Sequence, residues 1–290
     1  MVLEQIYPLK LIEKNVLFAL ILGIAYTIIG IGTAVVLFPE DPAIVAVAFT
    51  AILIIPTVNK LFKQAEYIEG KRKKSNLLLF FRDHYQIFII YALLFLGIFI
   101  VFSFFSIMLP NLAVNHIFEN QLEVKYGKTG SAVITGDAVV GTSIFKKIFF
   151  NNLSVLILCL ITAFLFGDGA FFLITWNASV WGIIFGHLAK TAAFAMGKDP
   201  FIYFLLIFAS VFPHMMLEAL SYFSSAAAGG ILSGGFTREK FMSEKFVHVL
   251  RDFILLMVLS IFIVFIAAYV ETYVLQNFDV YRTIIQQSFS

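Results

Sequence analysis

The stretch VFPHMMLEALSYFSSAAAGG, residues 211–230, decides the class of fold because it places ionisable side chains inside a long apolar run. The run extends over residues 201–235, whereas a bilayer core about 30 Å thick is crossed by about 20 apolar residues in a helix. It is therefore too long for one straight span. Proline removes a backbone donor and disrupts helices, so we expect Pro213 to interrupt this segment.

The composition of the whole chain agrees with a membrane environment. Of its 290 residues, 61% are hydrophobic and only 13% are charged, whereas a soluble domain has roughly 25% charged residues. Such a chain cannot cover a fold of this size with polar side chains, so its solvent must be lipid. We predict an all-α polytopic integral membrane protein.

Seven apolar segments are long enough to form membrane spans or large parts of them. They cover residues 16–38, 43–61, 85–109, 153–166, 170–195, 201–235 and 253–274. The fourth is short and meets the fifth at the sequence Gly-Asp-Gly, which is typical of a turn. This predicts a short or broken helix pair near residues 153–170.

Lysine and arginine gather in two of the connections between spans. Residues 60–82 hold seven basic side chains and residues 238–251 hold four, whereas the turn at 39–41 holds none. Cytoplasmic loops are enriched in Lys and Arg, so we expect both basic loops and the N-terminus in the cytoplasm and the C-terminus outside. One basic run is expected to contact anionic lipid and not nucleic acid. It comprises Lys71, Arg72, Lys73 and Lys74.

Residues 111–150 form the one long polar connection between spans. At its end, residues 142–152 (TSIFKKIFFNN) alternate apolar and basic side chains at helical spacing, with Asn151 and Asn152 where the chain enters the membrane. This pattern predicts an amphipathic helix on the membrane surface. The alternative is that these residues are the start of the next span.

Small residues recur every four positions in two of the apolar segments. The first series is Ala178, Gly182 and Gly186, and the second is Ala226, Gly230 and Gly234. In lipid, helices associate through close backbone packing because the hydrophobic effect does not drive them together. We therefore expect packed interfaces at both series, either between these helices or between two copies in a homodimer.

His214 and Glu218 lie one helical turn apart inside the membrane segment, and hence on one face. Ionisable groups at this depth are candidates for function. One hypothesis is a hydrogen-bonded pair with a structural role. The other is an ion or proton site beside a half-helix that begins at Pro213, the arrangement by which transporters bind ions.

Three further polar residues lie in or near the spans. Asp168 is expected to cap the following helix, with cation binding as the alternative. Asn177 is expected to cross-link helices through its amide, and His187 would belong to a transport path.

Nothing in the sequence requires a metal, a cofactor or catalysis. A metal site would need His214, Glu218, His187 and Asp168 to converge, and no HExxH helix motif is present. We therefore predict a protein that is not an enzyme. An intramembrane metal-dependent hydrolase is the minor alternative.

Several positions resemble the motifs of the stage II sporulation protein M family, in the same order and with compatible spacing. They are Asn151, Asn152, Gly167, Gly169, Asn177, Gly182, Pro213, His214 and Glu218. The resemblance covers about residues 75–290, which would be a five-span domain. Residues 1–74 would add a transmembrane hairpin and a basic cytoplasmic loop.

This resemblance implies a membrane protein of the cell envelope without known catalysis. In spore formers the family member is a membrane anchor that recruits cell-wall hydrolases, and nothing in this chain indicates sporulation. The expectation is therefore a scaffold or anchor for membrane or envelope proteins. A channel or transporter that uses His214 and Glu218 is the alternative.

Overall fold

The computed structural model describes the backbone of residues 12, 14–70, 77–126 and 141–288. Side chains are described over most of these ranges, except at residues 62–70, 77–84, 125–126, 141–143 and 168. The basic run 71–74 lies outside the described residues.

The described chain is helical and contains no strand. Its helices are α3 (Leu17–Leu37), α4 (Pro42–Gly70), α5 (Leu77–Met108), α6 (Asn111–Ile117), α7 (Glu119–Tyr126), α8 (Gly141–Phe166), α9 (Ala170–Ala195), α10 (Pro200–Arg238), α11 (Glu244–Asn277) and α12 (Asp279–Gln287). Seven of them, namely α3, α4, α5 and α8 to α11, are long and apolar enough to cross a membrane. The prediction of an all-α membrane protein with about seven spans is confirmed.

One detail of the predicted fourth span is wrong. Residues 142–152 belong to α8, which continues without a break to Phe166, so the alternative that they start the next span is the one observed. Only the three-residue 3₁₀ turn Gly167–Gly169 separates α8 from α9. The apolar side chains of residues 144–150 extend the fourth span to 23 residues, which removes the need for a separate surface helix.

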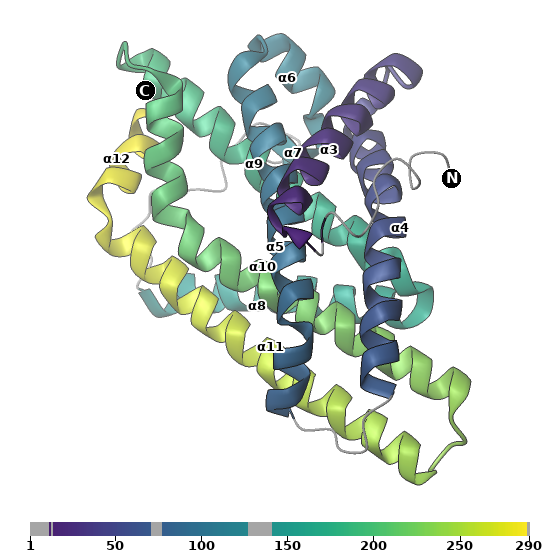
Figure 1. Ribbon diagram of the computed structural model, residues 1–290. Helices are drawn as coiled ribbons and strands as arrows, with labels where there is room; N and C mark the ends of the chain where they lie inside the picture. The colour runs from purple at the N-terminus through teal and green to yellow at the C-terminus, as the bar shows by residue number, and fades with distance from the viewer. Residues whose placement is uncertain (1–11, 13, 71–76, 127–140, 289–290) are drawn as a thin grey trace.

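Pro213 does not end a helix. It lies inside α10, which is one continuous helix of 39 residues. Proline deprives the carbonyl one turn earlier of its donor and pushes against it, which bends a helix when neighbouring helices hold both halves. Figure 1 shows α10 bending along its length. The start of α10 matches its sequence, since Asp199 accepts hydrogen bonds from the backbone N–H groups of Phe201 (2.8 Å) and Ile202 (3.1 Å).

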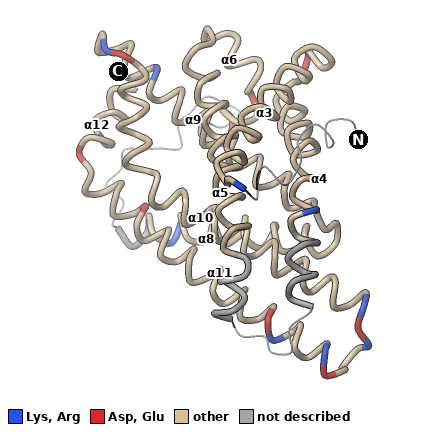
Figure 2. Tube along the Cα trace, in the orientation of Figure 1, with Lys and Arg blue, Asp and Glu red and all other residues tan. Residues whose placement is uncertain are grey.

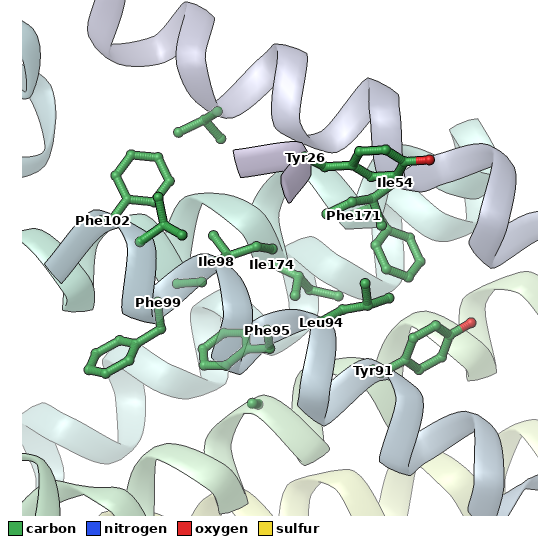
Figure 3. Close-up of a cluster of buried hydrophobic side chains, with 14 of the residues drawn as sticks. Tyr26, Ile54, Tyr91, Leu94, Phe95, Ile98, Phe99, Phe102, Phe171 and Ile174 are labelled. Atoms are coloured by element: carbon green, nitrogen blue, oxygen red, sulfur yellow. The ribbon is translucent and has the colours of Figure 1, made fainter. Parts of the chain in front are cut away.

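Helix α5 lies at the centre of the bundle and packs against α3 and α9. Aromatic and aliphatic side chains from α3, α4, α5 and α9 form one buried cluster around it (Figure 3). Helices α3 and α5 touch through backbone, since a Cβ on Gly23 would lie 2.7 Å from the carbonyl oxygen of Leu94. The N-terminal hairpin is thus packed directly on the following span.

The short helices α6 and α7 contact the N-terminal hairpin near its α3–α4 turn. His116 Nε2 lies 2.7 Å from the carbonyl oxygen of Pro39, and the Gln121 amide donates to the carbonyl of Ala43 at 3.2 Å. The α3–α4 turn and the α6–α7 pair lie at the upper end of Figure 1, and the α10–α11 turn lies at the lower end, where α4 ends and α5 begins. The end of α4 and the start of α5 therefore lie at the same end of the molecule as the α10–α11 turn.

Candidate functional site: a polar cluster between α8, α10 and α11

Glu218 joins three helices through its side chain. Asn152 of α8 donates its amide Nδ2 to Glu218 Oε1 at 2.7 Å, and the carboxyl of Glu271 on α11 hydrogen-bonds to that of Glu218. Glu218 is only 2% exposed, and Asn152 is also buried. Protein, and not lipid or bulk water, therefore surrounds the carboxyl group of Glu218, which the sequence predicted as a candidate site residue.

Small residues place Asn152 opposite Glu218. The Ser225 hydroxyl donates to the carbonyl of Leu156 at 2.8 Å, and a Cβ on Gly229 would lie only 2.6 Å from the carbonyl oxygen of Leu160. Side chains of this size let the two backbones approach closely. The contacts fall at residues 152, 156 and 160 of α8, which are one turn apart and hence on one face.

Two carboxyl groups meet in this cluster without a cation. A carboxylate has only acceptor atoms, so the hydrogen bond between Glu218 and Glu271 requires a proton on one of them. Among the described residues, neither carboxyl forms an ion pair with Lys or Arg. The arrangement therefore places two acidic side chains next to each other between α10 and α11 inside the membrane.

Glu271 is the site residue that sequence reasoning missed. It lies near the end of the last apolar segment, and an acidic side chain in such a segment is the signal that could have identified it. Glu271 follows Glu218 by 53 residues. The spacing of residues along one helix therefore cannot relate them.

The described residues show no direct hydrogen bond between His214 and Glu218, the predicted pair. His214 is buried, and its Nδ1 has no hydrogen-bond partner in the part of the chain that the structure describes. Glu218 bonds instead to groups on α8 and α11, which approach it from other helices. Spacing along one helix thus identified two buried polar residues but not their partners.

Of the remaining polar candidates, Asn151 adjoins this cluster, whereas Asn177 bonds within its own helix. Asn177 donates to the carbonyl of Leu173, one turn earlier in its own helix, at 2.8 Å. The expected cross-link from Asn177 to another helix is therefore wrong, because this carbonyl is within its reach. Asn151 donates to the Asn152 side chain at 3.2 Å. His187 is half-buried on α9, and the side chain of Asp168 lies outside the described residues. The described residues bring together no three His, Cys, Asp or Glu side chains at metal-binding distances.

The first small-residue series is a packed interface, but its partner is α5. A Cβ on Gly182 would lie 2.7 Å from the carbonyl oxygen of Phe99, and one on Gly186 would lie 2.7 Å from that of Ser103. Ala178 of the same series is fully buried. The expectation that the two series pack on each other is wrong, because α5 occupies this face of α9.

The second series behaves differently along its length. Ala226 packs against the core, whereas Gly230 and Gly234 have no atom within 4 Å of an added Cβ. Gly229, the neighbouring residue, makes the close contact with α8. Packing of Gly230 and Gly234 within the chain is therefore not observed, and their association with a second copy stays a prediction.

These features define a polytopic α-helical membrane protein with a buried polar cluster that joins three of its spans. The sequence model of the family described as stage II sporulation protein M matches residues 92–275, and the chain belongs to this family. The uncharacterized protein MJ0793 of Methanocaldococcus jannaschii is 29% identical to it over 143 residues, which cover 47% of this chain and 74% of that protein. No solved structure matches the chain.

Proposed function

We propose that this protein is a non-enzymatic membrane scaffold that associates with other proteins of the membrane or cell envelope, with a second copy of itself as its first partner. The observation that carries the proposal is the burial of Glu218 within helix contacts. Transport would require such a group to face water, whereas a scaffold requires only a firmly packed bundle.

Other polar groups in the spans also serve to join helices. The Ser106 hydroxyl of α5 donates to the carbonyl of Ile183 on α9 (2.9 Å), and Lys190 of α9 donates to the carbonyl of Leu109 after α5. Hydrogen bonds between spans are worth about 0.6 kcal/mol each on average in membranes, so several together stabilise one arrangement. This use of polar groups supports a structural role.

The exposed part of α10 supplies a surface for association. Gly230 and Gly234 lie one turn apart with open space above them, so another helix could approach this backbone closely. We propose that the homodimer forms here.

We expect Gly230→Leu to abolish self-association in lipid without unfolding the chain, because the added side chain meets open space in the monomer but separates two helices in a dimer. Single-molecule photobleaching in nanodiscs would measure the oligomeric state. Gly32→Leu is the matched control, since Gly32 is also exposed and has no atom within 4 Å of an added Cβ. Unchanged association in Gly230→Leu would exclude this face.

The orientation in the membrane is also part of the proposal, with the N-terminus in the cytoplasm and the C-terminus outside. In a Cys159→Ala background, Arg238→Cys should react only with reagent on the cytoplasmic side, and Glu40→Cys only from outside. The background is convenient because Cys159 is buried and is the one cysteine of the chain. Labelling in the opposite sense would reverse the orientation.

A proton-coupled transporter is the second candidate, and the pairing of Glu218 with Glu271 favours it. A group that binds a proton inside the membrane is a component of proton relays. The experiment on Glu218 in the Discussion separates this candidate from the scaffold.

A further inference from the structure

We propose that the turn between α10 and α11 is an anchor in the headgroup region of a phospholipid membrane, a role that goes beyond the proposed scaffold. This hairpin tip comprises residues 236–246. It carries the exposed apolar side chains Phe236, Phe241 and Met242, of which Phe241 is 70% and Met242 is 71% exposed.

The aromatic side chains of the hairpin tip form a preassembled group. The ring of Phe246 lies 5.1 Å from that of Phe236 and 5.3 Å from that of Phe241. Phe236 also contacts Phe164 at the end of α8, at 5.9 Å between centroids. An apolar surface held in place in this way does not need to reorganise before it enters lipid.

Charged residues alternate with these rings. The hairpin tip holds three basic side chains, Arg238, Lys240 and Lys245, and two acidic ones, Glu239 and Glu244. Figure 2 shows both signs of charge along this turn. Aromatic rings are enriched at the membrane–water interface, and long basic side chains extend there from apolar surroundings toward the phosphates.

The exposed surface of α11 indicates lipid as the occupant, in preference to a protein partner. Apolar side chains spaced three or four residues apart continue from the hairpin tip into the membrane-spanning part of the helix. They are Val247, Leu250, Ile254, Val258 and Ile261, all exposed in the monomer. The inner part of this stripe lies in a span, and its outer part runs toward the hairpin tip beside the exposed His248 and Arg251.

The lengths of α10 and α11 allow the hairpin to reach beyond the hydrocarbon core. Helix α10 has 39 residues and α11 has 34. At a rise of about 1.5 Å per residue these are about 58 Å and 51 Å long, whereas the bilayer with its headgroups is about 40–45 Å thick. If the hairpin is tilted, its apolar tip stays at headgroup depth. If the hairpin stood upright, the tip would be exposed to water.

The depth of the hairpin tip can be measured by spin labelling. In the Cys159→Ala background, labels at Phe241→Cys and Val247→Cys would be examined in vesicles of phosphatidylcholine and phosphatidylglycerol. We expect both labels to collide more often with oxygen, which concentrates in lipid, than with a water-soluble nickel complex. A label at Glu40→Cys in the exposed α3–α4 turn is the aqueous control.

A label at Phe241→Cys that behaves like the one at Glu40→Cys would overturn the proposal and place the hairpin tip in water. Because Phe241 is largely exposed, its replacement should not unfold the chain. Val247→Cys supplies an independent measurement on the same surface. A deeper position for Val247 than for Phe241 would agree with a tilted hairpin.

Discussion

Replacing Gly182 with leucine is expected to destabilise the bundle by about 3 kcal/mol or more, at the upper end of the cost of overpacking. A Cβ at this position would lie 2.7 Å from the carbonyl oxygen of Phe99 and 2.8 Å from the Cβ of Phe102. These atoms belong to or adjoin the backbone of α5, so the helices must separate. Added apolar surface provides no compensation, since lipid tails are as apolar as leucine.

Unfolding in mixed micelles with increasing denaturing detergent would measure this effect, together with the yield of folded protein. Gly32→Leu is the matched control on α3, because Gly32 is exposed and an added Cβ there contacts nothing within 4 Å. We expect the control to retain the stability of the wild type. Equal stability of the Gly182 variant and the wild type would contradict the packing of α9 on α5.

Replacing Glu218 with leucine is expected to lower the free energy of unfolding by roughly 1–3 kcal/mol, because it leaves buried polar groups without a partner. Asn152 would lose its acceptor and Glu271 its hydrogen-bonded neighbour. Glu218→Gln should retain most of the stability. Its amide oxygen can accept from Asn152, and its amide nitrogen can donate to a Glu271 carboxylate.

The same variants distinguish the scaffold from the transporter. The scaffold predicts no proton flux in liposomes for the wild type or for Glu218→Gln. Wild-type flux that disappears in a stably folded Glu218→Gln protein would establish a transport function. Glu40→Leu controls for loss of an acidic side chain, since Glu40 is exposed in the α3–α4 turn.

The sequence predicted the spans because hydropathy and local turn signals act within one helix. The apolar segments and the turn before α9 can both be recognised from neighbouring residues. The prediction for Pro213 failed because proline only weakens a helix locally. Packing by other helices keeps α10 continuous through it.

The candidate site was predicted only in part, and the reason lies in its contacts. Buried ionisable groups such as Glu218 are recognisable because charge in an apolar segment is costly. Their partners depend on which faces of distant helices meet. His214 was selected from spacing along α10, whereas the partners Asn152 and Glu271 come from α8 and α11.

Thus the sequence by itself determined that this protein is a helical membrane protein with small residues and polar groups inside its spans. Only the tertiary structure decided that Gly182 packs on α5, that Gly229 and not Gly230 contacts α8, and that Glu218 pairs with Glu271. Hydropathy depends on the residues of one segment. The choice of contacting face depends on how helices cross, which is a property of the whole bundle.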